Sequence, residues 1–156
     1  GLNQREMVET VREGKAAVVI MHMRGTPQTM QQLTQYENVV KEVRQHLLER
    51  AEMAVAAGIQ EVIIDPGFGF AKTAQQNFQL LNNIDVFAET GYPVLVGVSR
   101  KSFLGTLPSS TKMEDRLEAG IAAATVAAMK GASILRVHNV LECKKAMEVV
   151  EAVKAI

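Results

Sequence analysis

An arginine and a histidine stand two positions apart in "SILRVHNV", the segment that spans residues 133–140. The apolar residues of this segment predict a buried strand, and side chains two apart on a strand point to the same face. Arg136 and His138 therefore share one face of an otherwise apolar strand. Because a buried charge without a partner is costly, we expect them to meet either carboxylates of the protein or a polar ligand.

Three earlier apolar runs also end in polar side chains. His22 ends the first run, Asp65 ends the second, and Ser99 and Lys101 end the third. In barrels of alternating strands and helices, active sites lie at the carboxyl ends of the strands. Polar residues with both signs of charge at four strand ends predict that their side chains converge on one site. The alternative is that these polar residues stand at the strand ends by chance.

A regular alternation of strands and helices positions these residues. The apolar runs predict strands at residues 16–23, 61–65, 93–99 and 133–140, and helical patterns occupy residues 1–14, 38–58, 74–81, 116–131 and 141–156. Apolar strands separated by helices predict a parallel sheet covered by helices. Two α/β architectures compete, the doubly wound open sheet and the (β/α)8 (TIM) barrel. "GFGFAKT" lacks the third glycine of the dinucleotide fingerprint, so the barrel is favoured.

The composition excludes several classes of protein. The chain has 156 residues, of which 47% are hydrophobic and 22% charged, and its formal net charge is zero. Such a balance argues against nucleic acid or an anionic membrane as a partner. No apolar run approaches the ~20 residues of a transmembrane helix. Cys143 is the only cysteine, which rules out an intrachain disulfide and predicts a cytoplasmic protein.

Four segments together resemble the dihydropteroate synthase family: "MHMRGTPQTM", "IIDPGFGFAKT", "VGVSRKSFLG" and "RLEAGIAAATVAAMKGASILRVHNV". That family folds as a (β/α)8 barrel, and such a barrel needs ~250 residues. The resemblance implies that residues 1–156 form the C-terminal half of a pterin-binding TIM-barrel domain and supply about its last four βα units. The first half is expected to be absent from this chain, which does not begin with Met.

The resemblance also implies a reaction. The family condenses 6-hydroxymethyl-7,8-dihydropterin diphosphate with p-aminobenzoate to give 7,8-dihydropteroate and diphosphate in folate biosynthesis. The resemblance thus implies an enzyme that is a transferase of alkyl or aryl groups other than methyl. A guanidinium binds phosphate oxygens through paired N–H bonds, so the implied catalytic residues are Arg136 and His138 at the diphosphate, together with Lys101. Fixed donors there would stabilise the negative charge of the departing diphosphate.

The implied substrate-binding residues add to these three. The Asp65 carboxylate suits the N–H donors of a pterin, with a loop or helix-cap role as the alternative. Lys101 is implied to contact the pterin as well. Phe70 is expected to pack on an aromatic ring of a substrate, or simply to fill the barrel mouth.

Three further residues extend the implied pocket. Gly97 would let a ring approach the backbone, unless it marks a strand bulge. Ser99 is implied to lie near the p-aminobenzoate carboxylate. Met21 resembles the methionine that lines the pterin pocket and also fits a core position.

Other polar residues are expected to be structural. His22 alternates to the face opposite Met21, and His46 reads as part of a solvated helix face. Arg100 is expected to point away from the site and to form an ion pair. Cys143 is interpreted as a small apolar helix residue.

No metal ligand is assigned to this chain. The resemblance implies Mg²⁺, whose ligand is expected in the missing half, as well as a homodimer and sulfonamides as competing ligands. Two alternatives remain open: another pterin-binding barrel, such as a methyltetrahydrofolate-binding domain, or a non-catalytic half-barrel that serves as an assembly partner.

Overall fold

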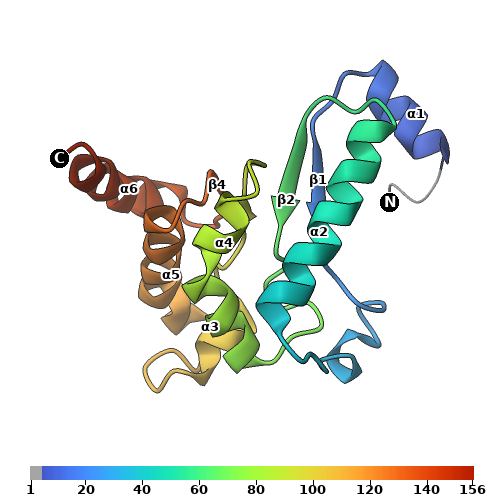
Figure 1. Cartoon of the computed structure of the whole chain (residues 1–156). Helices are drawn as coiled ribbons and strands as arrows, with labels where there is room; N and C mark the ends of the chain where they lie inside the picture. Colours follow the sequence, from blue (N-terminus) through green and yellow to red (C-terminus); the bar gives the residue numbers. More distant parts are fainter. Residues whose placement is uncertain (1–4) are drawn as a thin grey trace.

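Residues 5–156 form four short strands and six α-helices, with at least one helix after each strand (Figure 1). A computed structural model describes residues 5–156. The strands are β1 (Val18–Met21), β2 (Val62–Asp65), β3 (Leu95–Val96) and β4 (Ile134–Leu135). The helices are α1 (Arg5–Glu13), α2 (Val39–Ala56), α3 (Ala74–Asn82), α4 (Ile84–Ala88), α5 (Leu117–Met129) and α6 (Val140–Lys154). The short α4 was not predicted.

All strand pairs are parallel and follow the chain order. β1 pairs with β2 so that Met21 lies opposite Asp65, and β3 pairs with β4. A single parallel bridge between Ile64 and Val94 connects the two pairs. This arrangement confirms the predicted parallel sheet, in which helices connect successive strands.

Helices cover one face of the strands and leave the other face accessible. In Figure 1, α2 lies across β1 and β2, while α5 and α6 lie with β4 toward the other end of the molecule. Ile20 and Ile64 point to the covered face and are buried, whereas Val19 points to the opposite face and is 48% exposed. In a closed barrel, layers of side chains from all eight strands fill that inner face.

Helix α2 shows how local sequence fixes these elements. The side chain of Asn38 caps the helix by accepting a hydrogen bond from the Lys41 N–H at 3.0 Å, as N-cap residues do. Val43 and Leu47 lie four residues apart and are fully buried against the strands. Gly58 follows the helix with φ +89°, so the predicted glycine cap is confirmed.

The predicted burial of residues 133–140 is wrong. Ile134 is 37% exposed, and Arg136 and His138 are also exposed. β4 pairs only with β3 among the described residues, so its other edge and inner face have no covering neighbour there. The premise that Arg136 is a buried cation therefore fails, although its shared face with His138 remains.

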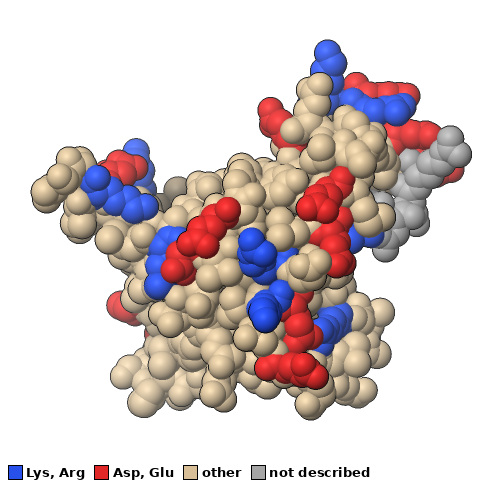
Figure 2. Space-filling model, viewed as in Figure 1, with Lys and Arg blue, Asp and Glu red and all other residues tan. Residues whose placement is uncertain are grey.

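Charges of both signs are mixed on the surface. In Figure 2, the described part of the face in view carries lysine and arginine next to aspartate and glutamate, without an extended patch of one sign. Over residues 5–156, none of the helices combines the length and the apolar character needed to span a bilayer.

Candidate active site

The carboxyl ends of β1 and β2 bring two predicted site residues together. Met21 and Asp65 are direct partners in the β1–β2 register and point to the accessible face of the strands. Both side chains are partly buried. The Asp65 carboxylate accepts a hydrogen bond from the Gly67 N–H at 2.8 Å, which leaves acceptor capacity for a ligand.

The ends of β3 and β4 form the second part of the site. The Arg136 N–H donates to the Val96 carbonyl at 2.9 Å, which places Arg136 beside Gly97. An added Cβ on Gly97 would lie 3.8 Å from Cβ of Arg136. Two residues further along, Nδ1 of His138 lies 3.1 Å from Oγ of Ser99. The structure therefore brings these four predicted site residues together across the two strands.

Lys101 and Phe70 connect the two parts. The Nζ of Lys101 lies 4.4 Å from the centroid of the Phe70 ring, within the range of a cation–π contact. Burial lowers the pKa of Lys101, and Arg136 lowers it further, while Asp65 raises it. The loop after β2 and the loop after β3 thus meet at this lysine.

Electrostatics couple the three charged residues of the site. Burial raises the pKa of Asp65, while the Gly67 N–H and the positive charges of Lys101 and Arg136 act to lower it. Arg136 makes no side-chain hydrogen bond or ion pair with residues 5–156. A guanidinium without a carboxylate partner is suited to bind an anionic ligand.

The loop after β2 has an unusual backbone that brings it close to β1. Gly67 has φ +73°, and a Cβ at this position would collide with the carbonyl oxygen of His22. Ala71 also has a positive φ, of +51°. Only glycine fits the position of Gly67, because both the backbone angle and the close approach exclude a side chain.

Sequence reasoning missed Lys72, which lies beneath this loop. Lys72 is only 3% exposed, and its Nζ contacts the Gly67 and Phe70 carbonyl oxygens and Nδ1 of His22. Burial is the largest cause that lowers the pKa of Lys72 to about 7. Burial and the positive charge of Lys72 lower the pKa of His22 to about 3. A lysine just before a helix N-cap is expected to be exposed to solvent. The sequence therefore contains no signal that Lys72 is buried.

Asn77 and Tyr36 also hold the loop and were not predicted. Oδ1 of the buried Asn77 accepts from the Gly69 N–H at 2.7 Å, and the Tyr36 hydroxyl donates to the Ala71 carbonyl at 3.0 Å. These contacts come from α3 and from the segment before α2. The loop that carries Phe70 is therefore fixed from several sides.

Three polar residues that the sequence predicts to be structural, His22, His46 and Arg100, contact other parts of the protein. His22 is buried, as its alternation to the face opposite Met21 predicted. His46 is exposed on α2 as predicted, but its ring also contacts His22 with centroids 5.0 Å apart. Arg100 donates to Oδ1 of Asn139 at 3.0 Å, so the predicted ion pair is wrong because its partner is a neutral amide.

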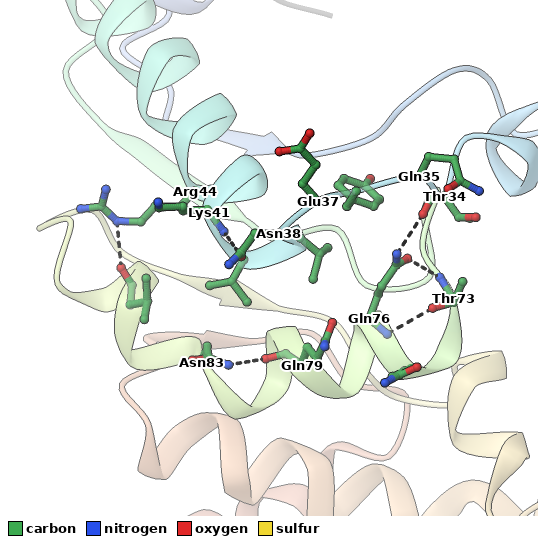
Figure 3. A pocket seen from close by; sticks show the side chains of 15 residues that line it. Thr34, Gln35, Glu37, Asn38, Lys41, Arg44, Thr73, Gln76, Gln79 and Asn83 are labelled. Atoms are coloured by element: carbon green, nitrogen blue, oxygen red, sulfur yellow. Dashed lines mark hydrogen bonds between the residues drawn. The ribbon is translucent and has the colours of Figure 1, made fainter.

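A polar hollow between two helices is separate from this site. It has a volume of about 740 Å³ and lies between the start of α2 and α3. Figure 3 shows its polar lining, where Gln76 bonds to Thr73 and to the carbonyl of Thr34. None of the predicted site residues lines it. The candidate site instead lies on the accessible face of the strands.

The described residues supply no evident metal site. Within residues 5–156, histidine, cysteine, aspartate and glutamate side chains do not form a group of three that could hold an ion. Among the predicted site residues, only Asp65 has a carboxylate.

Comparison with known proteins identifies the family. The family model described as "Pterin binding enzyme" matches residues 1–138. The chain belongs to the pterin-binding enzyme family. A curated relative, dihydropteroate synthase of Neisseria meningitidis serogroup C, is 43% identical over 155 residues, which cover 97% of this chain and 55% of the relative.

Solved structures of the family resemble the described fold closely. Dihydropteroate synthase from Thermus thermophilus in complex with 4-aminobenzoate is 40% identical, with a TM-score of 0.92 over 97% of this chain and 62% of that one. The same protein in complex with 6HMPPP gives a TM-score of 0.93 at 40% identity, over 97% and 61%. A Yersinia pestis dihydropteroate synthase with a sulfonamide drug complex gives 0.93 at 36% identity, over 99% and 57%.

The chain spans about 55% of the length of the Neisseria meningitidis relative. Four parallel strands with their helices therefore correspond to part of a family α/β barrel, and the predicted partial barrel is confirmed. The accessible inner face of β1 and the exposed β4 agree with this partial coverage.

Proposed function

We propose that the protein containing this chain is a dihydropteroate synthase, and that this chain supplies much of its substrate site. The observation that carries the proposal is the convergence of Asp65, Lys101 and Arg136 at the carboxyl ends of three parallel strands. The family relatives support it, because their structures contain 4-aminobenzoate or 6HMPPP.

The pterin would lie against the loop after β2. The Asp65 carboxylate would accept N–H bonds from the aminopyrimidinone edge of the pterin. Phe70 and Met21 offer apolar surface to the bicyclic ring. Lys101, already near Phe70 and coupled to Asp65, would donate to a pterin carbonyl or ring nitrogen.

The diphosphate would lie against β4. The nitrogen of p-aminobenzoate attacks the methylene carbon of the pterin substrate, the new C–N bond forms, and the C–O bond to diphosphate breaks with its electron pair. The departing diphosphate carries the negative charge. Arg136 and His138 would stabilise that charge through N–H donors. The amine then loses one proton to solvent, so no strong protein base is needed.

The second substrate would lie between the ends of β3 and β4. The hydroxyl of Ser99 would face the carboxylate of p-aminobenzoate. Gly97 leaves the backbone open, since nothing except Cβ of Arg136 would lie near an added side chain. Sulfonamides would compete for this position, as the Yersinia pestis complex suggests by analogy.

Several properties of the whole protein are part of the proposal. We propose that Mg²⁺ accompanies the diphosphate and takes its protein ligand from outside residues 5–156. Within these residues, histidine, cysteine, aspartate and glutamate side chains form no group of three that could hold an ion. We propose a cytoplasmic homodimer, supported by the single cysteine and by exposed apolar residues on α6, among them Val149 and Val153.

One assay tests the activity directly. The protein at its natural length is incubated with the pterin diphosphate, p-aminobenzoate and Mg²⁺, and dihydropteroate and diphosphate are both quantified. Equal amounts of the two products are expected. Binding of the pterin without product formation would instead favour another pterin-binding barrel.

A further inference from the structure

A buried primary amine connects the loop after β2 to the end of β1. Nζ of Lys72 lies 2.9 Å from the Gly67 carbonyl oxygen, 2.9 Å from the Phe70 carbonyl oxygen and 3.0 Å from Nδ1 of His22. Gly67 and Phe70 delimit one turn of the loop, and His22 directly follows β1. One amine thus fixes both ends of the turn to the neighbouring strand.

We propose that Lys72 is a positioning residue of the pterin site, which holds the 67–70 turn against His22 and thereby sets the places of Asp65 and Phe70. This inference rests on the proposed function, since it concerns the same pocket. The 67–70 turn contacts Asp65 and carries Phe70. Its Gly67 N–H donates to the Asp65 carboxylate, and its last residue carries the ring that contacts Lys101.

The hydrogen-bond roles of this cluster can be assigned. The two carbonyl oxygens only accept, so Lys72 donates one N–H to each of them. The third contact has two solutions. The ammonium form donates to an unprotonated Nδ1 of His22, whereas the neutral amine accepts from a protonated Nδ1. Both solutions keep the turn in place.

The protonation state of Lys72 also acts on Asp65. With its pKa lowered to about 7, Lys72 changes charge near neutral pH, whereas His22, with a pKa of about 3, stays neutral there. The charged groups that act on Lys72 are Asp65, Arg24 and Lys101, of which only Asp65 favours its ammonium form. The positive charge of Lys72 in turn favours the ionised form of Asp65.

The coupling between Lys72 and Asp65 acts on the free and the pterin-bound protein alike. Below pH 7 the Lys72 ammonium helps to stabilise the ionised Asp65 that accepts the pterin N–H bonds. As the pH rises through the pKa of Lys72, that stabilisation is lost while Asp65 stays charged. Pterin affinity is therefore not expected to change with the charge of Lys72 through this coupling alone.

The test compares three variants of the protein at its natural length. Lys72→Met removes the donors but keeps an unbranched side chain, and Lys72→Gln keeps two N–H donors that do not titrate. Lys41→Met is the matched control, because Lys41 is exposed on α2. Dissociation constants for the pterin diphosphate and for inorganic diphosphate are measured by calorimetry from pH 6 to 8.5.

A positioning role predicts a selective loss. Lys72→Met should weaken pterin binding tenfold or more and change diphosphate binding less than twofold, since Arg136 lies on β4. Lys72→Gln should recover part of the pterin affinity, and Lys41→Met should match the wild type. A merely structural role would weaken both ligands alike, and that result would overturn the inference.

Failure of this inference can be told from failure of the proposed function. Pterin affinity within twofold of wild type in Lys72→Met, together with a loss in Asp65→Asn, would overturn the role of Lys72 alone. Equal pterin binding by wild type and Asp65→Asn would overturn the proposed pocket and this inference with it.

A measurement on the wild type remains decisive if Lys72→Met does not fold. Nitrogen NMR of the His22 ring should show a neutral imidazole from pH 5 to 8.5, with its proton shifting between the two nitrogens as Lys72 titrates. Protonation of His22 near the ordinary histidine value of about 6.5 would contradict the assignment.

Discussion

Ser99 and His138 face each other across the β3–β4 pair, joined by two hydrogen-bond contacts. The Ser99 Oγ accepts from the backbone N–H of His138 at 3.3 Å and lies 3.1 Å from its Nδ1. Because the oxygen already accepts one bond, the hydroxyl hydrogen is free to donate to Nδ1 of the neutral ring. The Nε2–H is then available as a donor toward a ligand.

Removing the Ser99 hydroxyl should leave the His138 ring less well fixed in its orientation. In Ser99→Ala, the ring loses the partner that fixes its proton on Nε2, so diphosphate binding should weaken about fivefold, which corresponds to ~1 kcal/mol for one hydrogen bond. Calorimetry with inorganic diphosphate measures this. Ser109→Ala, at an exposed loop position, is the control. An unchanged affinity in Ser99→Ala would remove the pair from the anion site.

Arg136 should act on the diphosphate and hardly on the pterin ring. Arg136→Ala removes a guanidinium that has no protein ion-pair partner in residues 5–156. Its loss should raise the dissociation constant of the pterin diphosphate by at least tenfold, or ~1.4 kcal/mol. Binding of a pterin without phosphates should change little. Equal losses for the two ligands would count against an anion-binding role.

Asp65→Asn should weaken pterin binding. The substitution keeps the size of the side chain but turns one acceptor oxygen into a donor group. The loss should reach at least ~1.5–3 kcal/mol, the range for a hydrogen bond to a charged group. Calorimetry with a pterin that lacks phosphates isolates this contact. Unchanged affinity would exclude Asp65 from the pocket.

The same variant should be more stable than the wild type at neutral pH. Burial raises the pKa of Asp65 above its usual value, so the ionised carboxylate reduces folding stability at a pH above that pKa. The penalty shrinks as the pH falls through that pKa, and it is gone only below the pKa of an Asp in the unfolded chain, about 3.9. The stability gain of Asp65→Asn should thus be largest at neutral pH and shrink on acidification. Urea unfolding at several pH values measures it, and a gain independent of pH would contradict this cause.

The sequence predicted the elements other than α4, and the strand-end residues, because both follow from local patterns. Apolar runs and glycine caps identified the strands and α2, and alternation along a strand placed Arg136 and His138 on one face. Lys72 could not be found in this way, because its burial depends on a turn that folds back over it. The exposure of β4 was missed for a similar reason: burial depends on neighbouring strands, not on the apolar content of the segment itself.

Gly67 offers a test of the close approach between the loop and β1. Both Gly67 and Gly91 have positive φ values, of +73° and +83°, but only Gly67 has a backbone oxygen in the way of a side chain. Gly91→Ala should lower the free energy of unfolding by roughly 1–2 kcal/mol, because of the backbone conformation alone. Gly67→Ala should cost about 1–3 kcal/mol more, as overpacking does. Equal urea midpoints for the two variants would show that the loop after β2 shifts to accommodate the added Cβ without a loss of folding stability.

Residues 1–156 produced alone should not behave as a complete enzyme. The inner face of β1 exposes Val19, and β4 exposes Ile134, so the fragment should aggregate or dimerise to cover apolar surface. Light scattering coupled to size-exclusion chromatography measures its mass, and the protein at its natural length is the reference. Even a soluble fragment should form no dihydropteroate, because each lost substrate contact of ~1.4 kcal/mol lowers affinity tenfold. A monodisperse monomer with turnover near that of the reference would show that these four βα units suffice for the site.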